Sequence, residues 1–137
     1  MTAEFSLAVH GLVFLLHKDT IVTSDELAAN ICTNSARVRK VMARLKHFGL
    51  VRSSEGKGSG YHCIDHSEAI TLRQVLNALE ETAVSTNWRS GSVDMDCQIA
   101  SGMGAVMDDI YENMNLKCEA YLESVTIGMI QDRIFQR

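Results

Sequence analysis

Residues 24–64 read SDELAANICTNSARVRKVMARLKHFGLVRSSEGKGSGYHCI, and this stretch decides the fold. Its beginning predicts a short helix, because Thr23 or Ser24 can cap it and apolar side chains follow at helical spacing, at Leu27, Ala28 and Ile31. A turn at 33–35 precedes a second helix, which we expect from about Ser35 to Phe48. The inner face of this second helix is apolar, and its outer face carries basic side chains and a histidine, at Arg37, Lys40, Arg44 and His47.

A glycine-rich segment follows the second helix. Gly49 can end the helix, and two short apolar segments at 50–52 and 61–64 flank glycines at positions 56, 58 and 60. Two short strands around a glycine-rich tip predict a β-hairpin. Two helices, a turn and a hairpin in this order are typical of a winged helix-turn-helix, whose second helix enters the major groove of DNA. The alternative is a solvated basic helix on an enzyme, and the agreement of turn, basic face and hairpin argues against it.

The distribution of charge favours double-stranded DNA as the partner, although the net charge of the 137 residues is −4. Residues 34–63 contain seven Lys or Arg and one acidic residue, whereas residues 64–137 contain five Lys or Arg and twelve acidic residues. A basic patch on an otherwise acidic chain is suited to a nucleic acid. The acidic remainder limits indiscriminate binding to polyanions.

The rest of the chain is mainly helical. Residues 4–17 and 70–79 show helical periodicity, 82–101 are irregular, and Thr126 can cap a short last helix. A long helix is expected from about 102 to 124. Its apolar side chains recur at gaps of three and four residues, close to a heptad seam, at Met103, Met107, Ile110, Met114, Cys118, Tyr121 and Val125. Core or dimer packing is a more common role for such a seam than the lining of a small-molecule pocket.

These patterns predict an α+β fold that is mainly α. We expect a winged helix-turn-helix domain at 1–81, a linker or sensor loop at 82–101, and dimerisation helices at 102–137. No apolar run is long enough to span a membrane and no signal peptide is recognisable, so we expect a cytoplasmic protein without a membrane partner. The sequence contains no phosphate-binding loop, dinucleotide-binding glycine pattern or hydrolase motif, so we do not expect an enzyme.

The cysteines and histidines predict no metal site. The four cysteines form no C-x-x-C pair and are expected to be free thiols, and the five histidines lack the spacing of metal ligands. Cys32 and Cys63 flank the DNA-binding elements, and we interpret both as packing residues.

Several of these segments together resemble the Rrf2 family of bacterial transcription regulators. The resemblance rests on the quoted stretch, on AITLRQVLNALE at 69–80, on a lone cysteine at position 97 before a long helix, and on TIGMIQDRI at 126–134. Its most specific part is the pattern LxxxGLVxSxxGxGxGY from Leu45 to Tyr61. The resemblance implies a homodimer in which the long helices cross. It further implies a regulator, usually a repressor, that binds a pseudo-palindromic operator.

The resemblance also assigns candidate DNA contacts. Base-reading positions of the family fall on Ala36, Arg37, Arg39 and Lys40, and Glu55 stands where some members carry an arginine at the wing tip, which leaves Lys57 as its replacement. The full predicted DNA interface is Ser35, Ala36, Arg37, Arg39, Lys40, Arg44, Lys57, Ser59 and Tyr61. The predicted dimer interface is Met103, Met107, Ile110, Met114, Cys118 and Tyr121.

Cys97 is the candidate sensor. The iron–sulfur branch of the family uses three closely spaced cysteines in this loop, whereas here Cys97 stands alone, so the chain resembles the cluster-free branch and we expect no cofactor. A helix N-terminus lowers a thiol pKa and favours the reactive thiolate, while Asp94 and Asp96 would raise it. Our hypothesis is that oxidation or modification of Cys97 shifts the long helix and changes the spacing of the two DNA-binding domains. The alternative is a half-buried packing cysteine.

Other regulatory modes stay open from the sequence. The protein could respond to a small molecule bound between the linker and the long helix, or to an iron–sulfur cluster. In a third alternative, the winged helix is a protein-interaction module without affinity for DNA.

Overall fold

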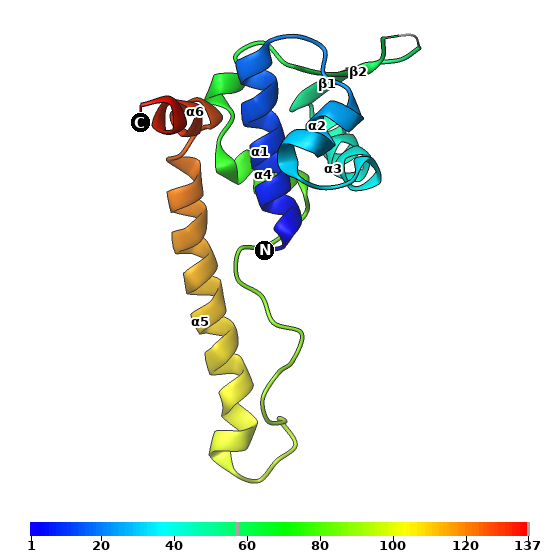
Figure 1. Cartoon of the computed structure of the whole chain (residues 1–137). Helices are drawn as coiled ribbons and strands as arrows, with labels where there is room; N and C mark the ends of the chain where they lie inside the picture. The colour runs from blue at the N-terminus through cyan, green and yellow to red at the C-terminus, as the bar shows by residue number, and fades with distance from the viewer. Residues whose placement is uncertain (57, 137) are drawn as a thin grey trace.

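The computed structural model describes residues 1–56 and 58–136. Figure 1 shows a compact N-terminal body from which one long helix projects. The elements in chain order are α1 (Ala3–Lys18), α2 (Ser24–Ile31), α3 (Ser35–His47), β1 (Val51–Ser54), β2 (Gly60–Cys63), the short 3-10 helix η1 (Ser67–Ala69), α4 (Leu72–Ala78), α5 (Gln98–Glu123) and α6 (Ile127–Phe135). No helix in the described ranges is long and apolar enough to cross a lipid bilayer.

The helices begin where the sequence places capping residues. Thr23 accepts a hydrogen bond from the backbone N–H of Glu26, and Asn34 accepts one from that of Arg37. Thr71 and Thr126 cap α4 and α6 in the same way, and Thr71 forms a reciprocal capping box with Gln74. Gly49 adopts φ +76° directly after α3, a left-handed conformation that favours glycine. Local signals therefore fix the helix boundaries of the N-terminal body.

The core lies between α1, α3 and α4. The predicted inner face of α3 is fully buried, at Val38, Val41, Met42 and Leu45. Leu12 and Leu15 of α1 pack in the same cluster. Burial of each such side chain contributes about 1.5–3 kcal/mol to folding. Gly11 lets α1 approach α3 closely, since a Cβ there would meet the Met42 Cε at 2.6 Å. The outer face of α3 is thereby held rigidly toward solvent.

The hairpin is an antiparallel pair with the register Val51↔Cys63, Arg52↔His62, Ser53↔Tyr61 and Ser54↔Gly60. A further bridge joins Val22 to Tyr61 through two backbone hydrogen bonds of 2.8 Å each. Gly60 makes this bridge possible, because a Cβ at that position would lie 2.5 Å from the Val22 carbonyl oxygen. The base of the wing is therefore fastened to the connection between α1 and α2.

The C-terminal part differs from the sequence prediction in two details. Helix α5 begins at Gln98 rather than near residue 102, because the linker folds back and Ser92 N–H donates to the Ala100 carbonyl in the first turn. The last helix packs on α1, and Ile127 N–H bonds the Ile70 carbonyl. The division into 1–81, 82–101 and 102–137 stays a prediction, although α6 lies beside the N-terminal body rather than along α5 (Figure 1).

Candidate nucleic-acid interface

The N-terminal part of α3 presents two free arginines. Arg37 and Arg39 are exposed, and neither forms an ion pair with a residue in the described part of the chain. The Asn34 side chain accepts a 2.9 Å hydrogen bond from the Arg37 N–H and so fixes the start of the helix. A helix N-terminus also carries positive potential, which attracts phosphate. These two guanidinium groups are therefore free to bind a polyanion.

Ser35 and Ala36 open the same helix in different roles. The Ser35 hydroxyl hydrogen-bonds the Asp25 carboxylate of α2 and ties the two helices of the motif together. Ala36 is exposed and small, so it allows close approach of a DNA base edge. The structure thus leaves Ala36 at the predicted surface, whereas the side chain of Ser35 is already engaged within the protein.

Two other predicted contacts, Lys40 and Arg44, interact with neighbouring helices. Lys40 Nζ lies 3.3 Å from Glu4 Oε1 of α1, yet its side chain is 62% exposed. Such surface pairs contribute about 0–1 kcal/mol, so a phosphate can compete for Lys40. Arg44 is half-buried, and its Nη1 donates a 2.8 Å hydrogen bond to the Leu79 carbonyl at the end of α4. The structure therefore places Arg44 in the packing of α3 on α4, and not on the exposed surface with Arg39.

Lys46 was missed as a candidate contact. It lies two helical turns after Arg39 and is exposed, so both side chains project from the same side of α3. The spacing of seven residues was the signal in the sequence that could have identified it. Arg37, Arg39 and Lys46 form the cationic part of the candidate interface.

The predicted DNA contacts in the hairpin differ in how exposed they are. Tyr61 is half-buried against the core, and its backbone forms the bridge to Val22, so its main role is to anchor the strand. Burial raises the pKa of the Tyr61 hydroxyl, and the positive charge of Arg39 opposes this rise, which places the arginine near the base of the wing. Ser59 is exposed and its N–H bonds the Gly56 carbonyl at the tip. Lys57 lies outside the described residues, so its contact stays a prediction.

The long helix exposes an apolar face. Met103, Ile110, Met114 and Tyr121 of the predicted seam are exposed, and Ile110 keeps 43% of its surface. Met107 and Cys118 are half-buried against the protein's own chain, and only Gly104 and Leu122 are buried among the residues of α5. Ile99 and Val106 extend the exposed face and were missed. Soluble proteins rarely leave a contiguous apolar face of this kind without a partner.

Cys97 stands at the start of the long helix. It is the N-terminal cap of α5 and is exposed, in contrast to the half-buried packing role considered as its alternative. The backbone N–H groups of Ala100 and Ile99 lower the pKa of its thiol. Of the other thiols, Cys63 is buried as predicted, but Cys32 is exposed in a left-handed cap after α2, so its assignment to packing was wrong.

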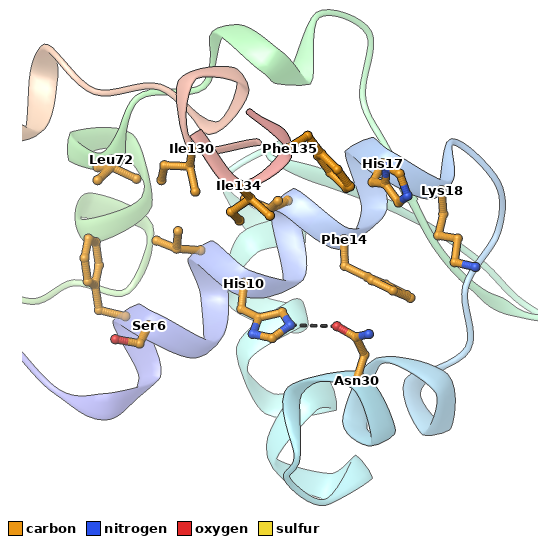
Figure 2. A pocket seen from close by; sticks show the side chains of 13 residues that line it. Ser6, His10, Phe14, His17, Lys18, Asn30, Leu72, Ile130, Ile134 and Phe135 are labelled. Atoms are coloured by element: carbon orange, nitrogen blue, oxygen red, sulfur yellow. Dashed lines mark hydrogen bonds between the residues drawn. The ribbon is translucent and has the colours of Figure 1, made fainter. Parts of the chain in front are cut away.

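A pocket of about 680 Å³ opens between α1, α6 and the end of α2 (Figure 2). Its walls are mostly apolar, and it is lined by Phe5, Phe14, Leu72, Ile130, Ile134 and Phe135. Its polar groups are Ser6, Lys18, His17, and His10 bonded to Asn30 over 2.7 Å, and no acidic residue is among the described residues that line it. We refer to it as the α1–α6 pocket. A second pocket opens between the linker and the long helix, where the sequence left a small-molecule site open as an alternative, and Arg89 and Asp108 pair there at 2.9 Å.

Comparison with known proteins agrees with this geometry. A family model described as "Rrf2: Iron-dependent Transcriptional regulator" matches residues 1–133. The HTH-type transcriptional regulator IscR of Photobacterium profundum is 22% identical over 128 residues, which are 93% of this chain and 68% of IscR.

Solved structures share the fold. A protein from Lactobacillus plantarum, described as a transcriptional regulator, matches with a TM-score of 0.85 and 24% identity over 100% of this chain and 93% of its own. CymR, the global cysteine regulator of B. subtilis, matches with a TM-score of 0.70 and 14% identity over 97% and 96% of the two chains. The predicted mainly helical α+β fold, a winged helix-turn-helix followed by a long helix, is confirmed.

Proposed function

Because this chain belongs to the Rrf2 family of transcription regulators, we propose that it is a homodimeric repressor whose two α3 helices bind the halves of a pseudo-palindromic operator. Its family makes it a DNA-binding transcription regulator and not an enzyme. The observation that carries the finer proposal is that Arg37 and Arg39, near the N-terminus of α3, are exposed and form no ion pair with a described residue, and that Arg39 lies near the base of the wing. Arginine binds both phosphate and guanine edges, so this placement suits groove binding.

The experiment is selection of binding duplexes from a random pool, followed by affinity measurements at several salt concentrations. We expect an inverted repeat whose half-sites are about one helical turn, or a multiple of it, apart. If Arg37, Arg39 and Lys46 of both subunits each neutralise a phosphate, log K falls against log salt with a slope of about −5. Failure to enrich an inverted repeat, together with salt-insensitive binding, would instead favour the protein-interaction module.

The exposed face of α5 supports the dimer. Its apolar side chains recur at helical spacing, and full burial of one such side chain contributes about 1.5–3 kcal/mol. Ile110→Lys places a charge at the centre of this face, and we expect the dimer dissociation constant to rise by at least about 100-fold in sedimentation equilibrium. Glu112→Lys is the matched control, because Glu112 is also exposed on α5 but lies away from the seam. A dimer that tolerates Ile110→Lys would contradict the assignment of this interface.

The family description names iron, which raises the question of an iron–sulfur cluster beside Cys97. A cluster needs several thiolate or comparable ligands. In the described ranges, the one group of three His, Cys, Asp or Glu donors close enough to share a metal ion is Asp19, His62 and Cys63, and Cys97 belongs to no such group. The residues around Cys97 do not fit a cluster held by one subunit, and we propose regulation without it. A visible absorbance band in anaerobically purified protein would contradict this.

A thiol response at Cys97 is part of the proposal. The thiol is exposed and its pKa is lowered by two backbone N–H groups, both of which favour reaction with electrophiles or oxidants. We expect oxidation to release DNA from the wild type and to leave a Cys97→Ser variant bound. Release of DNA from the oxidised variant would exclude Cys97 as the sensor.

The α1–α6 pocket favours a second mode of regulation, by a small amphipathic carboxylate. Its aromatic and aliphatic walls suit an apolar body, and Lys18 and the nearby histidines give its rim only positive or neutral groups. Indole-3-acetate is a suitable probe in a thermal-shift titration. We expect stabilisation of the wild type and a weaker response in Lys18→Gln, with Lys117→Gln on α5 as the control. Equal responses of all three proteins would exclude this pocket as the site.

A further inference from the structure

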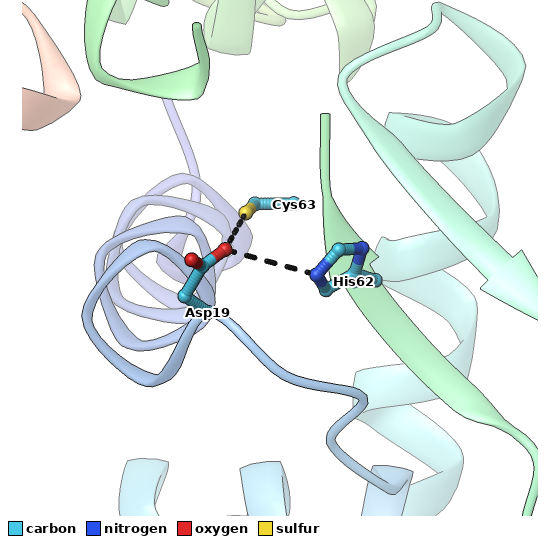
Figure 3. Close-up of side chains that lie close together, drawn as sticks. All are labelled: Asp19, His62 and Cys63. Atoms are coloured by element: carbon cyan, nitrogen blue, oxygen red, sulfur yellow. Dashed lines mark hydrogen bonds and ion pairs between the residues drawn. The ribbon is translucent and has the colours of Figure 1, made fainter. Parts of the chain in front are cut away.

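Three side chains with metal-binding donor atoms meet at the base of the wing. Asp19 follows α1, and His62 and Cys63 lie in β2; Figure 3 shows both side chains directed at the Asp19 carboxylate. Cys63 Sγ lies 3.5 Å and His62 Nε2 lies 3.8 Å from Asp19 Oδ1. The three donor atoms all lie within 4.8 Å of one another. We call this group the wing-base site.

The spacing of these donors suits a small transition-metal ion. Bonds of about 2.3 Å to sulfur and about 2.0–2.2 Å to nitrogen and oxygen separate the ligands of a tetrahedral Zn²⁺ ion by roughly 3.4–3.6 Å. The two measured separations from Asp19 are already close to this range. Asp19 is 79% exposed and can adjust, and one thiol, one imidazole and one carboxylate form a donor set that Zn²⁺ accepts.

The backbone holds the donors together without a metal. The Val22–Tyr61 bridge lies next to them in both segments, and β2 is paired with β1 along its length. Asp19 adopts φ 50°, the left-handed cap of α1, and its N–H bonds the Leu15 carbonyl. A metal ion would therefore join two segments whose relative position is already fixed, so little ordering has to accompany binding.

A buried hydroxyl lies beside the sulfur atom of this site. Ser67 is 1% exposed, and its Oγ has no hydrogen-bond partner among the described residues. A buried polar group left without a partner costs about 1–3 kcal/mol. The Cys63 thiol is close enough to interact with this hydroxyl, although without the geometry of a full hydrogen bond. A water molecule in the fourth position of a metal bound to Cys63 would give Ser67 its missing partner.

We propose that Asp19, His62 and Cys63 bind one divalent transition-metal ion of the Zn²⁺ class at the base of the wing, with water as the fourth ligand. Binding replaces the thiol proton of Cys63, which is released to solvent, and forms the metal–sulfur bond. The site is separate from Cys97 and from the exposed arginines of α3. It would tie α1 to the hairpin and restrain the wing that we place on DNA.

Cobalt titration of the reduced, metal-free full chain tests the proposal. We expect one Co²⁺ per chain, thiolate charge-transfer and tetrahedral ligand-field absorption bands, and displacement of the cobalt by Zn²⁺. Asp19→Asn and His62→Gln change partly exposed side chains, so both variants should remain folded, and each should weaken Co²⁺ binding by at least about tenfold. Cys63→Ser should abolish the charge-transfer band.

Cys97→Ser and His66→Gln are the matched controls, because each removes a donor of the same kind that lies outside the group of three. Both should bind Co²⁺ like the wild type. The proposal is wrong if the wild type shows no cobalt–thiolate band at saturation, or if the band survives Cys63→Ser and disappears in Cys97→Ser. Unchanged Co²⁺ affinity in both Asp19→Asn and His62→Gln would overturn it as well.

Discussion

Alanine in place of Arg39 and of Arg44 separates DNA contact from helix packing within one helix. Both arginines belong to α3 and both were predicted to enter the major groove. Arg39 is exposed beside the wing, whereas Arg44 is half-buried and donates a 2.8 Å hydrogen bond to the Leu79 carbonyl. We therefore expect Arg39→Ala to weaken DNA binding with the fold intact, and Arg44→Ala to lower the free energy of unfolding.

The magnitudes follow from these surroundings. An arginine that reads a base contributes about 1–3 kcal/mol, so Arg39→Ala should raise the dissociation constant by about 5- to 150-fold per half-site. If Arg39 instead neutralises a phosphate in each subunit, the salt slope of the dimer changes by about 1.8. A hydrogen bond from a charged group contributes about 1.5–3 kcal/mol, which is the expected loss of unfolding free energy in Arg44→Ala.

DNA affinity is measured by fluorescence anisotropy on the selected duplex at several salt concentrations. The free energy of unfolding is measured by urea unfolding of the same preparations. Arg39→Ala should unfold within about 0.5 kcal/mol of the wild type, as expected of an exposed substitution. The reasoning is refuted if Arg39→Ala binds DNA normally at all salt concentrations. It is equally refuted if Arg44→Ala keeps full stability while it loses a DNA contact.

Three further predictions follow from single contacts. Gly60→Ala should break the bridge between Val22 and Tyr61 at a cost of about 1–3 kcal/mol, which is measured as faster amide exchange of both residues. By contrast, a Cβ at Gly102 meets no atom within 4 Å, so Gly102→Ala should stabilise α5 by up to about 1 kcal/mol. Iodoacetamide should alkylate Cys97 faster than an unperturbed thiol near neutral pH, and its rate should level off at a lower pH because its pKa is lowered. Zn²⁺ at 100 times its dissociation constant should stabilise the native protein by about 2.7 kcal/mol in urea unfolding, and the Asp19→Asn variant should gain less; equal gains would contradict a site at the wing base.

The parts of the fold that could be predicted are those decided by neighbours in sequence. Caps at Thr23 and Thr126, the glycine stop at Gly49 and the buried face of α3 depend on residues within a few positions of one another. The exposed seam of α5 was identified for the same reason, because helical spacing alone decides which side chains share a face.

The features that were missed join residues far apart in sequence. Arg44 bonds a carbonyl 35 residues away, and Asp19 meets Cys63 44 residues away. The residues near Arg44 or Asp19 in the sequence give no sign of these distant partners. An arginine on the outer side of a helix has the same local sequence pattern whether its side chain contacts DNA or the end of a neighbouring helix. The spacing of the histidines could not reveal that His62 lies beside Asp19, because the carboxylate comes from another element.

Arg44 also lies next to the point where the N-terminal body continues into the linker and α5. Leu79 is the C-terminal cap of α4 and precedes the linker, which is bonded to α5 by Asn115 at Val84 and by Asp108 at Arg89. Helix α5 has 26 residues and is about 39 Å long, and its first turn, which Cys97 caps, is the end far from α3 (Figure 1). Within the described chain, the linker and α5 lead from that end back to Leu79 and the core.

A displacement of the linker and α5 after reaction at Cys97 would therefore reach α3 through the Leu79 carbonyl and Arg44. If this contact carries the effect, DNA affinity in Arg44→Ala should depend less on alkylation of Cys97 than it does in the wild type. A double-mutant cycle measures that difference as a coupling free energy, which is the evidence that a proposed path between sites requires. Arg39→Ala is the control, because it should lower affinity equally before and after alkylation. An unchanged response in Arg44→Ala would place the coupling in the dimer contact of α5 instead.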